Sequence, residues 1–230
     1  MLTDFINLLF PQVCAACDAI LETHEEVLCT DCRVDLPLTN DHFRNENESF
    51  TRFKGRLDLQ KASSLLYFEK KGPVQEMIHD LKYRGNEKVG ELLGAWHASL
   101  LKDTLWHKEV DVVIPVPIHQ KRKHQRGYNQ VKKYAEAFAN EFECRMDEKL
   151  LIRKSATKTQ VFKNRSARTE VSEKNYYLSL PVEQLTSYQH THFLLVDDIL
   201  TTGVTLETCA KQLLCIQGAK VSIACMAVTM

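Results

Sequence analysis

The sequence contains no run of about 20 apolar residues, the length needed to cross a bilayer, which excludes a membrane-spanning protein. Its first residues, Met1-Leu2-Thr3-Asp4-Phe5, lack the basic segment and small-residue cleavage site of a secretory signal. No internal repeat or low-complexity tract is present, and 30 Lys and Arg balance 30 Asp and Glu. These absences predict a cytoplasmic globular protein without membrane insertion, and the neutral balance argues against a dedicated nucleic-acid binder.

The neutral net charge conceals a segregation of charge along the chain. Acids predominate in the first 50 residues, whereas residues 121–168 contain 14 Lys and Arg against five Asp and Glu. Such segregation indicates either domains with different roles or one surface built for an anion. A solvated basic face that binds nothing explains the same statistics equally well.

The eight cysteines divide the chain in a similar way. Four of them, spaced Cys-x2-Cys-x11-Cys-x2-Cys, are Cys14, Cys17, Cys29 and Cys32. In a reducing compartment this spacing predicts a structural zinc site, because four thiolates close a tetrahedral shell and leave no open position. A redox dithiol or plain buried cysteines are the alternatives, and His24 and His42 are substitute ligands.

Beyond the cysteines the pattern changes to short apolar strands that alternate with helices. We expect strands at 62–68, 110–115, 193–196 and 221–228, and helices at 73–82, 87–101, 128–141 and 203–216. This alternation predicts an α/β fold, namely a mostly parallel, Rossmann-like sheet with helices on both faces. We expect two domains, a zinc module with a linker at 1–55 and the α/β domain at 56–230. The linker is predicted because the stretch 38–58 is polar and weakly patterned.

Ligands of such sheets bind at the carboxyl ends of the strands, and the clearest motif stands there. It reads Asp197-Asp198-Ile199-Leu200-Thr201-Thr202-Gly203-Val204-Thr205 and leads into a helix. Threonine hydroxyls, a glycine and the free N–H groups of a helix N-terminus form a phosphate cradle. Adjacent carboxylates suit ribose hydroxyls, directly or through Mg²⁺. A capped helix with two surface acids is the alternative, and a P-loop is excluded because Gly-Lys-Ser/Thr is absent.

The segment Phe193–Thr205 resembles the signature of type I phosphoribosyltransferases, which bind 5-phosphoribosyl-1-pyrophosphate (PRPP). The resemblance implies that Asp197 and Asp198 face the ribose and bind Mg²⁺ partly through the ligand, while residues 201–205 wrap the 5′-phosphate. Other motifs narrow the resemblance to the ComF family (ComFC and GntX-like proteins). They are the cysteine module, Leu81-Lys82-Tyr83-Arg84-Gly85, Pro115-Val116-Pro117 with Arg122 and Arg126-Gly127-Tyr128-Asn129-Gln130, and Thr159-Gln160 with Arg165 and Arg168.

Basic residues near two strand ends suit the pyrophosphate of PRPP. The predicted pyrophosphate-binding residues are Lys82, Arg84, Arg122 and Arg126. Arg122 and Arg126 share a face if a helix begins early, and otherwise line a loop. Instead of binding pyrophosphate, Arg122 and Arg126 would simply belong to an exposed basic loop. Lys82 and Arg84 would end a helix, where bases compensate the helix dipole. Catalytic residues stay unassigned, with Lys82, Tyr83 and Arg126 as candidates and with Tyr83 and His119 as general-base candidates by position only.

Two functional classes follow from these motifs. The ComF resemblance implies that the protein handles single-stranded DNA during DNA uptake in natural transformation, with the uptake machinery as partner. Residues 121–168 would then contact phosphates, and Tyr128, Tyr134 and Phe138 would stack on bases, although aromatics at helical spacing are more often core. The alternative is an enzyme that transfers the phosphoribosyl group to an unidentified acceptor. A third possibility combines the two: the phosphoribosyl site binds a ligand or a single-strand end without turnover. The long loop 153–175 is expected to be a lid or binding loop.

Overall fold

The computed structural model describes residues 11–104, 106–154 and 175–230. Within these residues one five-stranded sheet has the order β1-β7-β6-β2-β3, and every neighbouring pair is parallel, which confirms the predicted fold class. Its strands are β1 (Ala62–Phe68), β2 (Val112–Pro115), β3 (Arg145–Met146), β6 (His192–Leu200) and β7 (Lys220–Thr229). A separate antiparallel pair is formed by β4 (Leu151–Arg153) and β5 (Tyr176–Leu178).

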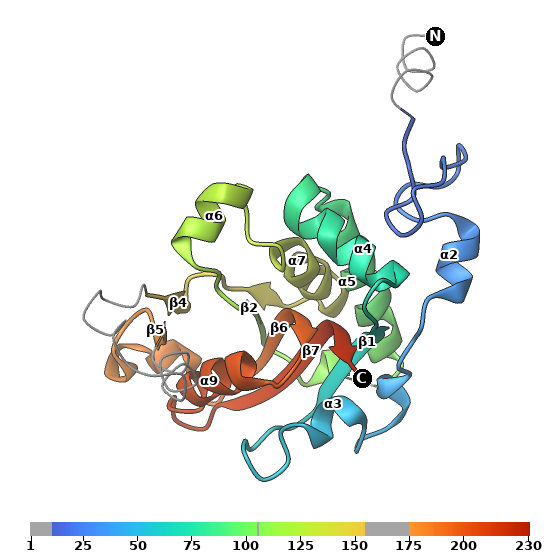
Figure 1. Cartoon of the computed structure of the whole chain (residues 1–230). Coiled ribbons are helices and arrows are strands. Elements are labelled where there is room, and N and C mark those ends of the chain that lie inside the picture. The colour runs from blue at the N-terminus through green and yellow to red at the C-terminus, as the bar shows by residue number, and fades with distance from the viewer. Residues whose placement is uncertain (1–10, 105, 155–174) are drawn as a thin grey trace, which may run out of the picture.

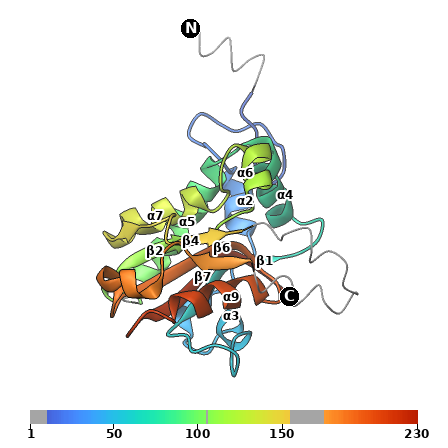
Figure 2. The same ribbon diagram turned by 90° about the vertical axis from the view of Figure 1, so that its left-hand side faces the viewer.

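Helices cover both faces of the sheet (Figures 1 and 2). One face carries α4 (Pro73–His79), α5 (Lys88–Lys102) and α7 (Lys132–Phe142), and the other carries α3 (Glu48–Thr51) and α9 (Val204–Leu213). Each face buries its own apolar cluster. In β6, Leu194 and Val196 pack into the first cluster, while Phe193 and Leu195 pack into the second. Burial on both faces explains why this strand is a continuous apolar run rather than an alternating one.

A close helix contact holds the first layer together. An added Cβ at Gly94 of α5 would lie 2.7 Å from the carbonyl oxygen of Tyr134 in α7 and 2.8 Å from the Cβ of Ala137. Beside it, the buried His97 ring contacts Tyr134 Oη at 2.6 Å and Ser63 Oγ of β1 at 2.8 Å. Glycine therefore permits the two helices to approach, and a buried polar chain joins both of them to the sheet.

The stretch 38–58, expected to be a linker, is packed against the sheet. Asn47 Oδ1 caps α3 by accepting the N–H of Phe50, while its Nδ2 donates to three backbone carbonyls, those of Asp41, Arg44 and Ala62. Ser49 Oγ lies 2.7 Å from Ser64 Oγ of β1. The polar residues of this stretch satisfy one another inside the protein, which a hydrophobic pattern does not reveal.

Several element bounds differ from those expected. Residues Gln120–Arg126 form a helix of their own, α6, separate from α7. A π-helical turn, Asp80–Arg84, follows α4. Most of the expected lid 153–175, including Gln160, Arg165 and Arg168, lies outside the described residues. In the part of the chain that is described, no helix has the length and apolar character needed to cross a membrane.

The packing of α5 on α7 yields a stability prediction. We expect Gly94→Ala to lower the free energy of unfolding by about 1–3 kcal/mol, because the new methyl group overlaps the backbone of α7. Urea denaturation measures this difference. Gly90→Ala is the matched control: its nearest neighbours are 3.5 Å away, so the gain in helix propensity of about 0.5–1 kcal/mol should prevail. Equal effects of the two substitutions would contradict the close contact.

Candidate functional site

Two adjacent carboxylates lie near the end of β6. The strand continues to Leu200, so Asp197 and Asp198 lie inside it, whereas we expected it to end at Val196. Pairing with β7 continues through Asp197 opposite Cys225 and Leu200 opposite Val228, which extends the ladder past the acidic pair. Asp198 Oδ1 accepts the N–H of Ile199 at 2.7 Å, and this bond helps to fix the carboxylate.

The acidic pair has the electrostatics of a cation site. Burial, and then the negative charge of Asp198, raise the pKa of Asp197 to about 8. Desolvation and a like charge both disfavour the ionised form of a carboxyl group. A divalent cation relieves both effects, and Mg²⁺ prefers one or two carboxylates together with ligand oxygens. The donor set therefore fits Mg²⁺ that arrives with an anionic ligand.

Asp198 is the centre of a polar chain that joins three elements. Lys82 Nζ, from the turn after α4, lies 2.7 Å from Asp198 Oδ2. Gln130 Nε2 donates to the same oxygen at 3.1 Å, and Gln130 Oε1 accepts from Arg126 Nη1 at 2.8 Å. Lys82 and Arg126, which come from separate motifs, are thus brought to the acidic pair. Gln130 received no role from the sequence, although it ends the Arg126–Gln130 motif.

A basic cavity of about 520 Å³ opens beside this chain. Its lining residues are Lys82, Tyr83, Gly85, Arg122, Gln125, Arg126 and Tyr128. Arg122 and Arg126 lie one turn apart on α6, which decides between the helix and loop arrangements. None of the lining residues is acidic, so the cavity is suited to an anion.

Arg84 does not join the other predicted pyrophosphate-binding residues. Its guanidinium lies 2.8 Å from Asp80 Oδ1 and 3.6 Å from Asp18 Oδ1, and it is not among the residues that line the basic cavity. Asp18 belongs to the N-terminal cysteine segment. Arg84 therefore connects that segment to the turn after α4.

The threonine-rich loop lies at the same end of the sheet as the acidic pair. Thr201 and Thr202 are exposed, and the following Gly203 caps α9 with a φ of +78°. This conformation favours glycine, which supports the role expected for Gly203. Val204 and Thr205 begin α9, so the free N–H groups of a ten-residue helix face the loop. The role expected for residues 201–205, a phosphate cradle, stays a prediction.

The aromatic residues separate into core and surface. Tyr134 and Phe138 are fully buried, which confirms that they are core residues and excludes them as exposed stacking platforms. The half-buried Tyr128 donates its hydroxyl to the carbonyl of Leu81. Tyr83, by contrast, is 66% exposed, and the Arg126 guanidinium lies 5.1 Å from its ring centroid. Tyr83 is therefore the exposed ring at the basic cavity.

The four N-terminal cysteines converge. Their sulfur atoms lie within 4.8 Å of one another, and Sγ of Cys17 and Sγ of Cys29 are 3.8 Å apart. A tetrahedron with Zn–S bonds of about 2.3 Å has edges of about 3.8 Å, so the cluster fits zinc. Cys14 Sγ accepts the N–H of Cys29, a bond that suits a thiolate. Neither His24 nor His42 is part of the cluster, whose last two cysteines, Cys29 and Cys32, lie at the N-cap and in the first turn of α2 (Thr30–Asp35).

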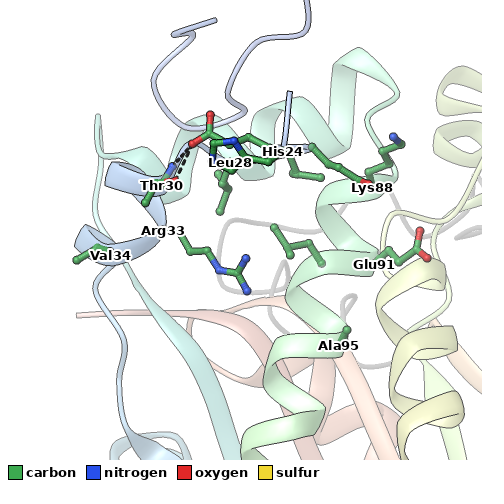
Figure 3. Close-up of a pocket in the computed structure, with 12 residues that line it drawn as sticks. His24, Leu28, Thr30, Arg33, Val34, Lys88, Glu91 and Ala95 are labelled. Atoms are coloured by element: carbon green, nitrogen blue, oxygen red, sulfur yellow. Dashed lines mark hydrogen bonds between the residues drawn. The ribbon is translucent and has the colours of Figure 1, made fainter. Parts of the chain in front are cut away.

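A second cavity, of about 600 Å³, separates the cysteine module from α5 (Figure 3). Its walls carry both charges: Arg33 and Lys88 are basic, and Glu25 and Glu91 are acidic. Glu25 is already occupied, because it accepts hydrogen bonds from the backbone N–H and hydroxyl of Thr30. Apart from His24, no residue predicted for a site lines this cavity, which lies between the cysteine module and α5.

Zinc removal tests the cysteine cluster. We expect Cys17→Ser to lose bound zinc and to lower the thermal unfolding midpoint, because an alcohol is a poor substitute for a thiolate ligand. Zinc content after gel filtration, measured by mass spectrometry, reports the loss. Cys215→Ser, which replaces an exposed cysteine outside the cluster, should retain zinc. Full zinc content in Cys17→Ser would refute the four-thiolate site.

Comparison with known proteins agrees with both modules. Residues 133–229 match the family model of the phosphoribosyl transferase domain, and residues 5–43 match that of the double zinc ribbon domain. The DNA utilization protein YhgH of Escherichia coli (strain K12) is 28% identical over 228 residues, which cover 95% of this chain and 91% of the relative. Its namesake from Salmonella typhi is 28% identical over 164 residues, 69% of this chain and 68% of the relative. The chain therefore matches the phosphoribosyl transferase domain over residues 133–229, which hold part of its mostly parallel sheet, and its four-cysteine cluster fits a zinc module.

Proposed function

We propose that the protein binds PRPP with Mg²⁺ at the carboxyl end of β6 and handles single-stranded DNA during DNA uptake in the cytoplasm. The observation that carries the first part is the chain Arg126–Gln130–Asp198–Lys82, which joins the basic cavity to the acidic pair. We retain 1–55 and 56–230 as the proposed domains.

Each part of PRPP finds a complementary group at this end of the sheet. Residues 201–205 receive the 5′-phosphate, and Asp197 and Asp198 accept hydrogen bonds from the ribose hydroxyls. Lys82, Arg122 and Arg126 face the pyrophosphate across the cavity. Asp197 and Asp198 would hold Mg²⁺, whose chemistry there is to neutralise pyrophosphate charge. Another ribose phosphate would satisfy the same groups in part.

Two features support the DNA role. The relatives from Escherichia coli and Salmonella typhi bear the name DNA utilization protein. In addition, α6 buries none of its residues and carries four Lys and Arg, beside the exposed ring of Tyr83. Such a combination of basic groups and an exposed aromatic ring suits a single strand, whose phosphates and unstacked bases it contacts separately. The DNA-uptake machinery is the proposed partner.

Turnover is the alternative function, favoured by the convergence of Lys82 and Arg126 near the pyrophosphate position. Positive charge held there stabilises the leaving pyrophosphate as its charge develops. Of the two general-base candidates, Tyr83 lines this cavity, whereas His119 caps α6 and is not among the lining residues. Release of pyrophosphate in the presence of candidate acceptors distinguishes this enzyme from a binding protein.

The acidic pair is tested by replacing both carboxylates with amides. We expect Asp197→Asn with Asp198→Asn to weaken Mg-PRPP binding by about 100-fold or more, because the Mg²⁺ ligands and the ribose acceptors are lost together. Isothermal titration calorimetry measures the affinity. Asp58→Asn with Asp103→Asn, which neutralises two exposed acids, is the charge-matched control. Unchanged affinity in the first variant would rule out the proposed site.

The basic cavity is tested by the salt dependence of single-stranded DNA binding. We expect Arg122→Gln with Arg126→Gln to reduce the slope of log affinity against log salt by about 1.4, since each phosphate contact contributes about 0.7. Tyr83→Ala should lower affinity by about 1–3 kcal/mol without a change in slope, because stacking involves no counterion. Fluorescence anisotropy measures both, with Lys54→Gln and Lys211→Gln as controls. A slope that the arginine variant leaves unaltered would exclude α6 as the phosphate contact.

A further inference from the structure

A short segment outside the two regions that match family models contacts the threonine-rich loop through its side chains. Residues 52–56 follow α3 and lie in neither the 5–43 nor the 133–229 match. Three of their side chains, those of Arg52, Phe53 and Arg56, contact the loop Thr201–Gly203 or residues next to it. We call these three residues the loop clamp.

Arg52 holds the first peptide of the loop. Its Nη1 donates to the carbonyl oxygen of Thr201 at 2.5 Å, and its Nη2 donates to the carbonyl of Thr229 at the end of β7. The same guanidinium pairs with Glu48 of α3 at 2.7 Å. Arg52 therefore fixes the loop relative to the last strand of the sheet.

Arg56 holds the second peptide. Its Nη1 donates to the carbonyl of Thr202 at 3.1 Å, and its Nη2 pairs with Glu207, one turn into α9. Glu207 is mostly buried by its partners and also pairs with Lys211 at 2.7 Å. One guanidinium thus spans the loop and the helix that the loop begins.

Phe53 fixes the third residue of the loop. Its side chain is 1% exposed, and its ring carbon Cε1 would lie 2.8 Å from a Cβ at Gly203. Only glycine fits between this ring and the start of α9, and the ring leaves Gly203 little room to move toward the core. The clamp is itself anchored, because Asn47 and Ser49 bind the preceding residues to β1.

These contacts determine where the loop amides point. In a trans peptide the C=O and N–H bonds point in opposite directions, and the described residues contain no cis peptide. Since the carbonyls of Thr201 and Thr202 face the arginines, the N–H groups of Thr202 and Gly203 face away from them. A cation on a carbonyl also polarises the peptide and strengthens its N–H as a donor.

We propose that Arg52, Phe53 and Arg56 are positioning residues that orient the loop N–H groups toward a phosphate monoester at the site. This inference rests on the proposed ribose phosphate binding. It gives residues 52–56, which were expected to belong to a linker, a role in the affinity for the phosphate ligand. None of the three side chains needs to touch the ligand, because each acts through the backbone of residues 201–203.

The test compares three ligands by calorimetry: ribose 5-phosphate, Mg-PRPP and inorganic pyrophosphate. We expect Arg52→Gln with Arg56→Gln to weaken the first two by the same factor, about tenfold or more, because both carry the 5′-phosphate. Binding of inorganic pyrophosphate, held by Lys82, Arg122 and Arg126, should be unchanged. A merely structural role would weaken all three ligands together.

Controls separate the clamp from general instability and from the proposed function. Lys54→Gln, on the same segment but paired only at the surface with Glu46, should match the wild type. Backbone ¹⁵N order parameters of Thr202 and Gly203, measured without ligand, should be lower in the double arginine variant, because the loop loses its carbonyl partners. Wild-type affinity for ribose 5-phosphate in that variant overturns the clamp and leaves the proposed function intact. If the wild type binds neither ribose 5-phosphate nor Mg-PRPP, the proposed function fails, and the phosphate-positioning role of the clamp, which rests on it, fails as well.

Discussion

Two carboxylates side by side near the buried end of β6 set the constraint on which this end of the molecule depends. Desolvation, and then the charge of Asp198, raise the pKa of Asp197, and one cation and one amide donor from distant parts of the chain offset the charge of Asp198. Lys82 comes from the turn after α4, and Gln130 from the turn that precedes α7. Because both converge on Asp198, the acidic pair organises its surroundings before any ligand is bound.

The neighbouring phosphate loop is held from its other side. Side chains that bind the backbone of a loop can fix its peptide planes without occupying the space that a ligand needs. Arg52 and Arg56 do this at Thr201 and Thr202, and they do so from a segment that packs on β1 through its own hydrogen bonds. The acidic pair is thus arranged by groups on the side of α4 and α7, and the loop by groups on the side of α3 and α9 (Figure 2).

Apolar periodicity was sufficient to predict four strands of the sheet, but not the two-residue β3 and not every strand end. β1 occupies Ala62–Phe68 as expected, because its apolar run is bounded by polar residues. β6 continues past Val196 because β7 offers a pairing partner through Val228, and a sequence pattern that stops at a polar residue does not contain that information. The parallel character of the sheet followed from the alternation of strands and helices, and the cysteine cluster from the spacing of the cysteines.

The motifs of the candidate site were predictable from the sequence, but the hydrogen bonds between distant residues were not. Spacing marked Asp197, Asp198 and residues 201–205, but the role of Gln130 depends on a contact across 68 positions. Asn47 and Ser49 resemble linker residues in sequence because their partners are backbone carbonyls and hydroxyls, which leave no hydrophobic pattern. Tyr83 could not be separated from Tyr134 by composition, since only packing decides which ring is exposed.

Charge neutrality of the whole chain does not determine the field at the cavity. Fixed charges in solution act over about 10 Å at moderate salt, so an anion at the cavity responds to the groups that line it rather than to the total. Lys82, Arg122 and Arg126 line it without an acid among the lining residues, whereas many acids lie in the N-terminal module. Arg84, which is not among the lining residues, pairs with Asp80 and with Asp18 of that module. Segregation of charge along the sequence thus becomes segregation in space, which permits a neutral protein to present a basic site.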